Sequence, residues 1–278
     1  MAARLFLCFA SAAFALMAPG QSHAWGALGQ ATISQAAVRQ LDASARLVLM
    51  EILAVESADE LSDAVDEACS WPDAIRGTPE GSWSAPLHYV NIPRSSERYD
   101  RQRDCPDGLC VTEGVLKYAA ELGRPGLDRA RRRQAFAWLC HLVADLHQPL
   151  HAGFRDDRGG NQVEIIFQGE RSNLHRFWDS LLAEHRLPDA QSRASAIEQA
   201  SGRRIDTPWD PADVANWTNE SHALAIARAY PPGPLIEAGF ADASWLVVQR
   251  QWRRAAGRLA VILNEVLPAG SARPVREN

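Results

Sequence analysis

Apolar positions that recur every three or four residues run through most of the chain, and they predict a protein built of helices. From Leu28 to Glu56 this period is interrupted near Asp42, which predicts two helices, and an acidic third helix is expected over residues 58–69. The same period predicts further helices over residues 111–122, 127–146, 174–184, 190–202, 211–230 and 238–267. We therefore expect an all-α fold.

Two stretches depart from the helical period. Residues 71–106 are rich in proline, glycine and serine, which predicts a long connection, and connections of that length usually carry function. In "QVEIIFQG", Val163, Ile165 and Phe167 lie on one side of an extended chain, which is typical of a short strand or hairpin over residues 162–168. The sequence holds no internal repeat, so we expect one mainly helical domain.

The first 24 residues have the organisation of a secretory signal peptide. A short basic start precedes an apolar run from Leu5 to Met17, and the small-residue pattern Ser22-His23-Ala24 follows it. Cleavage after this pattern would leave Trp25 as the first residue of one domain over residues 25–278, with its core over 25–268. The mature protein would be periplasmic or secreted, without a membrane anchor, because no later stretch stays apolar for about 18 residues.

The charge balance limits the ways in which this protein could bind a phosphate. The chain has 29 basic and 34 acidic residues, a formal net charge of −5, and loss of Arg4 with the signal peptide leaves 28 against 34, or −6. Proteins that capture nucleic acid by broad electrostatic attraction normally carry a basic surface. Phosphate chemistry here must rely on local positive charge, and a bound metal ion is one source of it.

The mature chain would contain four cysteines, in an export context that permits disulfides. Cys105 and Cys110 bracket the turn sequence "PDGL", so we expect a local bridge between them. Cys69 and Cys140 could form a second bridge. Sequence alone leaves three pairings of the four cysteines open.

The segment "HLVADLHQPLHAG", residues 141–153, concentrates histidine and points to metal binding. His141 and Asp145 are four residues apart, so both side chains face one side of the expected helix and can reach one metal ion, and Asp145 could bridge two ions. Pro149 ends that helix and can turn His151 back towards the same centre.

A second pair, His175 and Asp179, repeats this spacing on another expected helix. One such pair arises easily by chance, but two within forty residues of an exported protein predict a metal site. Imidazole and carboxylate ligands together suit zinc. His147 lies six residues after His141 and faces elsewhere, so we expect it to support a ligand by a hydrogen bond instead of binding metal.

Seven short motifs then give the chain a family resemblance. They are "WGALG" (25–29), "SWPDAIR" (70–76), "LHYVNIP" (87–93), "HLVADLHQPLHAG" (141–153), "DDRGGN" (156–161), "NLHRFWD" (173–179) and "NWTNES" (216–221). In this order the sequence resembles the zinc-dependent type I nucleases, which include fungal single-strand-specific nucleases and plant bifunctional nucleases. The motifs span nearly the whole mature chain, so chance is a poor explanation.

The resemblance implies a helical phospholipase C/nuclease-like fold with a cluster of three zinc ions at the bottom of a cleft. The first zinc would be bound by Asp73, His88, His141 and Asp145. The second would be bound by His151, His175 and Asp179. The third would be bound by the α-amino group and carbonyl of Trp25, by the residue at position 30, and by Asp145.

Position 30 departs from the family pattern, because Gln30 stands where the family has a histidine. An amide oxygen is a weaker, neutral ligand than imidazole, so the third zinc should be held less tightly or be missing. The α-amino group of Trp25 can bind metal only after the signal peptide has been removed.

The resemblance also suggests residues that contact the substrate. Arg76 stands where the family has a basic residue near the bound phosphate, although a plain surface ion pair is the competing interpretation. Asn161 matches a residue that hydrogen-bonds the nucleobase, although Gly-Gly-Asn is also common turn chemistry. Asp73 is expected to orient the attacking hydroxide as well as to bind metal.

We therefore expect a monomeric zinc-dependent endonuclease, without a stable protein partner, that hydrolyses RNA and single-stranded DNA to 5′-phosphate products. Nucleotides with a 3′-phosphate are a further candidate substrate. One alternative is a zinc-dependent phospholipase C, which has a similar fold and also begins with a zinc-binding tryptophan. That family usually has glutamate where Asp179 stands and lacks the "GGN" and "NWTNES" motifs. A second alternative, suggested by Gln30, is an exported zinc-binding protein without catalytic activity.

Overall fold

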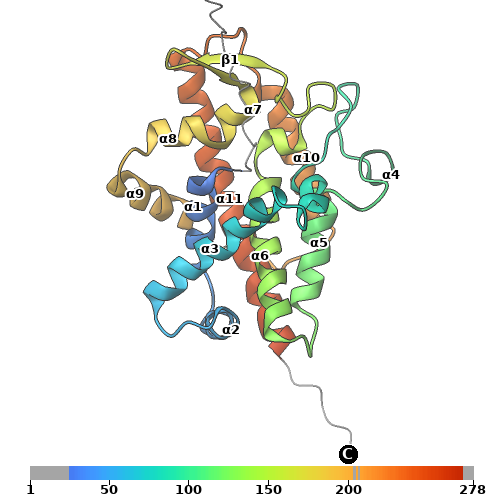
Figure 1. Ribbon diagram of the computed structural model, residues 1–278, viewed down its shortest axis with the longest axis vertical. Helices are drawn as coiled ribbons and strands as arrows, with labels where there is room; N and C mark the ends of the chain where they lie inside the picture. The colour runs from blue at the N-terminus through green and yellow to red at the C-terminus, as the bar shows by residue number, and fades with distance from the viewer. Residues whose placement is uncertain (1–24, 203–204, 206, 272–278) are drawn as a thin grey trace, which may run out of the picture.

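The computed structural model describes residues 25–202, 205 and 207–271, and these are almost entirely helical (Figure 1). The first half contains α1 (Ala27–Val38), α2 (Ala43–Leu53), α3 (Ala58–Arg76), the 3₁₀ turn η1 (Ser82–His88), α4 (Arg101–Asp104), α5 (Val111–Leu122), α6 (Arg129–Leu146) and the 3₁₀ turn η2 (Pro149–Ala152). The second half contains β1 (Glu164–Phe167), β2 (Glu170–Asn173), α7 (Leu174–Arg176), the π-helical segment η3 (Phe177–Leu181), α8 (Leu182–Arg186), α9 (Ala190–Ser201), α10 (Asp213–Leu224), the π-helical segment η4 (Ala225–Ala229) and α11 (Ala238–Ser271). The predicted all-α class is confirmed.

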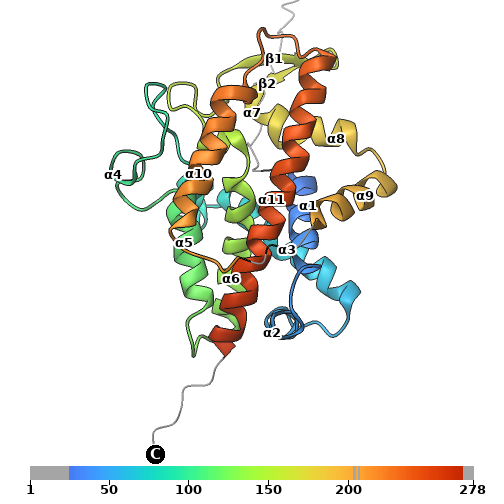
Figure 2. The ribbon, with the colours of Figure 1, turned by 180° about the vertical axis from the view of Figure 1, so that it is seen from behind.

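Helix α6 lies in the middle of the molecule, and α11 runs along its back from one end to the other (Figure 2). Helices α3, α5 and α11 all pack against α6, while α1 packs against α3, α9 and α11. Every residue of α6 from Ala135 to Leu146 is buried, because other elements surround it. A helix that is buried on all sides cannot leave its polar side chains solvated, so His141 and Asp145 must find partners inside the protein.

The predicted hairpin is present and extends further along the chain than expected. Strands β1 and β2 pair antiparallel from Glu164–Asn173 to Phe167–Glu170. Gln168 and Gly169 connect them with φ angles of 52° and 84°, the left-handed backbone that two-residue hairpin turns require. The hairpin leads directly into α7, so it fixes where the second His/Asp pair begins.

The prediction of a connection over residues 71–106 is wrong for its first part. Helix α3 does not end at Cys69 but continues to Arg76, with Pro72 inside it. Proline normally interrupts a helix, but here Pro72 and Asp73 are buried, so tertiary packing outweighs the local preference. The η1 turn and α4 also lie within this stretch, and the remainder is irregular.

Two expected helices are divided by π-helical segments. The helix predicted over residues 174–184 consists of α7, η3 and α8, and the helix predicted over 211–230 consists of α10 followed by η4. Such π-helical insertions are rare and often occur at functional sites, and η3 carries Asp179.

The predicted Cys105–Cys110 disulfide is present, and the second bridge, which the sequence left open, joins Cys69 to Cys140. The second joins α3 to α6 across 71 residues of sequence. The predicted signal peptide, residues 1–24, lies outside the described residues.

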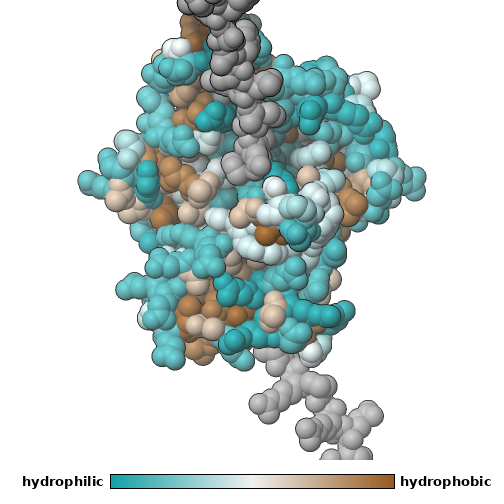
Figure 3. Space-filling view, viewed as in Figure 1, coloured by the Kyte–Doolittle hydropathy of each residue, from teal (hydrophilic) through white to brown (hydrophobic). Residues whose placement is uncertain are grey.

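The face shown in Figure 3 is mainly hydrophilic, with hydrophobic side chains gathered over α2, where Leu47 is exposed. Among the described helices, none is long and apolar enough to cross a membrane.

Candidate metal centre

The fold brings the predicted metal ligands together in two adjacent groups. In each group the potential ligand atoms all lie within 4.8 Å of one another. The first group, drawn from α3, η1 and α6, consists of Asp73, His88 and His141. The second group, drawn from η2, α7 and η3, consists of His151, His175 and Asp179. These residues are separated by up to 68 positions in the first group, so only the packed fold makes them neighbours.

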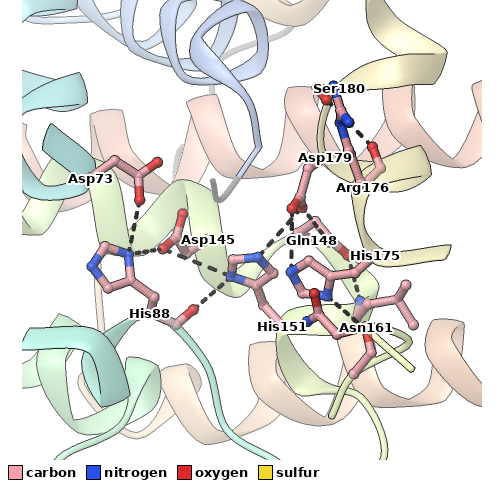
Figure 4. Close-up of polar contacts among 12 residues, drawn as sticks. Asp73, His88, Asp145, Gln148, His151, Asn161, His175, Arg176, Asp179 and Ser180 are labelled. Carbon is pink, nitrogen blue, oxygen red and sulfur yellow. Dashed lines mark hydrogen bonds and ion pairs between the residues drawn. The ribbon is translucent and has the colours of Figure 1, made fainter. Parts of the chain in front are cut away.

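Asp145 lies between the two groups and is fully buried (Figure 4). Its Oδ2 atom is 3.0 Å from Nδ1 of His88 and 3.2 Å from Nε2 of His141. The same oxygen is 3.8 Å from Nδ1 of His151, in the second group. Asp145 is therefore placed where one carboxylate can serve both groups, as its position on α6 predicted.

Backbone carbonyls fix the orientation of three of the four histidine rings. His141 Nδ1 donates to the Cys69 carbonyl at 2.7 Å, His151 Nδ1 to the His88 carbonyl at 2.6 Å, and His175 Nδ1 to the Gly159 carbonyl at 2.6 Å. Nε2 is then the ring atom left to bind a metal ion. A carbonyl or carboxylate that holds the second nitrogen of a histidine is the usual support of a metal ligand.

The ionisation of these side chains also fits a bound cation. Burial lowers the pKa of His88 and of His175. Burial acts in the same direction on His141, but the carboxylates of Asp145 and Asp73 outweigh it and raise the pKa of His141 to about 9. These carboxylates favour a cation at this position, and a metal ion bound there would take the place of a proton.

Histidines of both groups line a cavity of about 560 Å³. His88, His151 and His175 line it together with the two predicted substrate-binding residues, Arg76 and Asn161. A cavity of this size is within the usual range for a small-molecule or substrate site. It therefore gives a substrate access to the candidate metal centre.

Two interpretations were considered for Arg76 and for Asn161, a contact with the substrate or an ordinary ion pair or turn. Each residue shows features of both. The Arg76 guanidinium lies 3.5 Å from Asp73 Oδ1, so it forms an ion pair with a predicted metal ligand. Asn161 donates from Nδ2 to the Arg158 carbonyl at 2.9 Å, which is turn chemistry, yet it also faces the cavity.

Comparison with known proteins decides the family. A model of the S1/P1 nuclease family matches residues 25–268. The chain belongs to the S1/P1 nuclease family. Its members are hydrolases that act on phosphodiester bonds, and the family resemblance predicted from the seven motifs is confirmed.

The chain is similar to nucleases of plants and fungi. Endonuclease 3 of Arabidopsis thaliana is 30% identical, over 88% of this chain and 90% of its own length. Nuclease P1 of Penicillium citrinum is 28% identical, over 87% of this chain and 97% of its own length. Nuclease S1 of Aspergillus oryzae is 28% identical, over 71% and 68% respectively.

Residues 25–30 lie against the two groups of predicted ligands. The buried Trp25 ring packs edge-on against Trp252, and the Gly26 N–H donates to the Asp179 carbonyl at 2.7 Å. Gln30 is buried, and its Nε2 donates to Oδ1 of Asp145 at 2.8 Å. Its Oε1 is buried without a hydrogen-bond partner among the described residues.

One residue of this S1/P1 nuclease site was missed by the sequence analysis. Gln148 is fully buried and donates from Nε2 to Oδ1 of Asp179 at 2.7 Å, while its Oε1 accepts from the Leu150 N–H. Gln148 lies inside the histidine-rich motif, so its position was a signal, but its partner is 31 residues away and could not be identified from spacing.

His147, in contrast, does not support a predicted ligand, and that expectation was wrong. Its Nδ1 donates to the Val143 carbonyl, and its Nε2 accepts from Arg258 at 2.8 Å. Burial and the Arg258 charge lower the pKa of His147 to about 3. His147 is thus a neutral residue that joins the end of α6 to α11.

Proposed function

We propose that this protein is a zinc-dependent endonuclease that hydrolyses RNA and single-stranded DNA to 5′-phosphate products, and that it also accepts 3′-nucleotides. The observation that carries the proposal is the position of Asp145 between two groups of histidine and aspartate ligands on the wall of a cavity that Arg76 and Asn161 share. The family match and the names of the relatives support the same activity.

In this proposal the first zinc is held by Asp73, His88, His141 and Asp145, and the second by His151, His175 and Asp179. Nitrogen and carboxylate ligands in this number suit zinc. When bound, the zinc ions lower the pKa of a coordinated water towards ~7 and neutralise charge on the phosphate. The third site, at Trp25 and Asp145, has Gln30 in place of a histidine and is the weakest of the three.

The side chains around the cluster would then position and stabilise the reacting groups. Asp73 orients the attacking water and accepts hydrogen bonding from it, because its carboxylate lies at the edge of the first group beside Arg76. Arg76 donates to a non-bridging oxygen of the scissile phosphate, with a guanidinium geometry that matches two oxygens at once. Asn161 presents its side chain to a nucleobase in the same cavity.

We further propose that the protein is exported, to the periplasm or out of the cell. The disulfides Cys69–Cys140 and Cys105–Cys110 support this, because structural disulfides persist in oxidising compartments. The protein would act as a monomer on single-stranded nucleic acid or nucleotides.

The test is to incubate the protein, purified from the exported fraction, with single-stranded DNA, RNA, a 3′-nucleotide and phosphatidylcholine, each with and without a chelator. We expect chelator-sensitive cleavage of both nucleic acids, with 5′-phosphate ends on the products. Cleavage of phosphatidylcholine alone would establish the phospholipase C alternative. Zinc binding without hydrolysis of any substrate would establish the non-catalytic one.

Two histidine variants make this test specific to the candidate centre. His175→Ala removes a predicted ligand and should lower both the zinc content and the rate of cleavage. His185→Ala is the matched control, because His185 is exposed on α8, outside both ligand groups. Equal loss of zinc or of activity in the two variants would contradict the proposed ligand set.

A further inference from the structure

Arg158 is an exposed residue of the "DDRGGN" loop, and its side chain lines the same cavity as Arg76 and Asn161. Its backbone has φ +56°, in the left-handed region, and Gly159 and Gly160 continue with φ +63° and +80°. Three successive residues in this conformation turn the chain sharply beside the cluster. Neither the family match nor the proposed mechanism gives Arg158 a role.

The left-handed backbone conformation does not explain why residue 158 is an arginine. Gly159 must be glycine, because an added Cβ would lie 2.5 Å from the Leu150 carbonyl oxygen. At position 158 a glycine would adopt the left-handed conformation more easily than any residue with a Cβ. The backbone carbonyl of Arg158 accepts a hydrogen bond from Asn161. Because every residue type has this carbonyl, the bond does not require an arginine. The strained conformation at a cavity wall therefore points to a function of the side chain.

The charges around Arg158 leave its guanidinium available to a ligand. Its two acidic neighbours are already neutralised, because Arg94 donates to Asp156 at 2.8 Å and to Asp157 at 2.9 Å. The other nearby arginine, Arg155, pairs with Asp104 at 3.1 Å. Among the described residues, the Arg158 guanidinium makes no hydrogen bond or ion pair.

The loop that carries Arg158 is fixed relative to the candidate metal centre. Asp157 accepts from the Gly160 N–H at 2.8 Å and from the Tyr230 hydroxyl at 2.7 Å. The Gly159 carbonyl accepts from Nδ1 of His175, a predicted zinc ligand. The position of the loop is thus set from both sides, which is what a substrate-binding residue requires.

We propose that Arg158 binds a phosphate of the nucleic-acid strand other than the one being hydrolysed. This inference rests on the proposed nuclease function. Arg76 contacts Asp73, a predicted zinc ligand, and is the cation placed for the scissile phosphate, whereas Arg158 lines the same cavity without an ion pair to a predicted zinc ligand. In a protein of net negative charge, one unpaired arginine at the cavity gives a specific attraction for the strand.

Kinetics with short substrates test this role. For a hexanucleotide, Arg158→Ala should raise KM about fivefold, as expected of one exposed ionic contact, and leave kcat unchanged. For a dinucleoside monophosphate, whose only phosphate is the scissile one, the same variant should change neither constant. For the hexanucleotide, the KM of Arg158→Lys should lie between that of the wild type and that of Arg158→Ala. Arg250→Ala, which removes an exposed arginine from α11 outside the cavity, is the control for a general charge effect.

Salt dependence and stability separate binding from a structural role. Each phosphate contact to a single strand contributes about 0.7 to the slope of log KM against log salt, so Arg158→Ala should reduce that slope by about 0.7. Arg158→Gly should give the same loss of binding without lowering Tm, because glycine relieves the left-handed backbone. Equal KM changes for both substrates, or a fall in kcat alone, would overturn the inference.

A binding measurement decides the inference independently of catalysis. The Kd of the zinc-loaded protein for a labelled phosphorothioate hexanucleotide, which keeps the charge but resists cleavage, should rise about fivefold in Arg158→Ala. An unchanged Kd would overturn the role of Arg158, whether or not the wild type cleaves natural strands. A raised Kd in a protein that cleaves no strand would instead contradict the proposed function and leave Arg158 as a binding residue.

Discussion

Gln30 donates a hydrogen bond from Nε2 to Oδ1 of Asp145 over 2.8 Å, and both side chains are buried. Position 30 is thus in contact with the carboxylate that lies between the two ligand groups, although 115 residues separate them in sequence. In the S1/P1 family pattern this place belongs to a histidine ligand. Compared with the histidine that the resemblance implies, the amide of Gln30 is a weaker, neutral ligand.

Replacing Gln30 with histidine should therefore restore a third metal ligand. We expect Gln30→His to raise the zinc content of the exported protein by about one ion per chain, because imidazole binds zinc far better than an amide. A third ion beside the scissile phosphate should also raise kcat severalfold. Elemental analysis gives the zinc content, and steady-state kinetics with single-stranded DNA give kcat.

Gln30→Ala is the control for this experiment, because it removes the hydrogen bond to Asp145 without supplying a ligand. Its zinc content should not exceed that of the wild type. If the histidine variant and the wild type have the same zinc content and the same kcat, the weakness of the third site does not originate at position 30.

Gln148 should be needed for tight binding of the second zinc. Its amide donates to Oδ1 of Asp179 at 2.7 Å, so Gln148→Ala would remove a hydrogen bond that orients this predicted ligand. Loss of such a supporting hydrogen bond typically weakens metal affinity by about 10–100-fold. Competition with a chromophoric chelator measures the affinity. Gln134→Ala, at an exposed position of α6, should leave it unchanged, and a similar loss in both variants would contradict the role of Gln148.

The sequence was informative where a site is local and less so where it depends on packing. The spacing of His141 and Asp145 on one helical face predicted their shared role, because four residues are about one helical turn. Asp73 and His88 came only from the family resemblance, since they reach His141 through the packing of α3 and η1 on α6. The extension of α3 past Cys69 was missed for the same reason.

The surroundings of Gln148 and Arg158 show what local sequence patterns leave out. Asp179 lies 31 residues from Gln148, and the acids beside Arg158 are neutralised by Arg94, more than sixty residues away. A sequence shows that these residues are polar, but only the fold shows which polar groups are already paired. The importance of a side chain at the site depends on that pairing.

Asp66 should make the stability of the protein depend on pH. Burial raises the pKa of its carboxyl to about 6, although Gln35 and Ser34 donate hydrogen bonds to it. In an unfolded chain the pKa is ~3.9, so the folded state binds this proton more tightly. The contribution of this proton to the free energy of unfolding is fully present below about pH 4. It is lost as the pH rises through about 6.

Asp66→Asn removes this titration and should stabilise the protein only at higher pH. For a half-buried carboxyl we expect a gain of roughly 1 kcal/mol at pH 8 and almost none at pH 4, measured by urea unfolding across that range. Asp59→Asn, at an exposed position on the same helix, is the matched control, because Asp59 is not among the groups that shift the Asp66 pKa. A gain that is the same at every pH would show that the effect of Asp66→Asn is not electrostatic.

The Cys69–Cys140 disulfide should hold the metal centre together as well as stabilise the fold. It joins α3, which carries Asp73, to α6, which carries His141, and the Cys69 carbonyl also accepts from Nδ1 of His141. A bridge across 71 residues contributes about 4 kcal/mol in the chain-entropy description. The double variant Cys69→Ala/Cys140→Ala should therefore lose most of that stability and bind zinc more weakly.

The second disulfide provides the comparison that separates these two effects. Cys105–Cys110 closes only 5 residues, so its removal should cost about 2 kcal/mol, and neither cysteine adjoins a predicted ligand. Cys105→Ala/Cys110→Ala should lower Tm but keep the zinc content at saturating metal. Because the two bridges differ in whether they hold α3 against α6, a similar loss of zinc affinity in both variants would mean that general destabilisation, and not the geometry of Asp73 and His141, controls the metal centre.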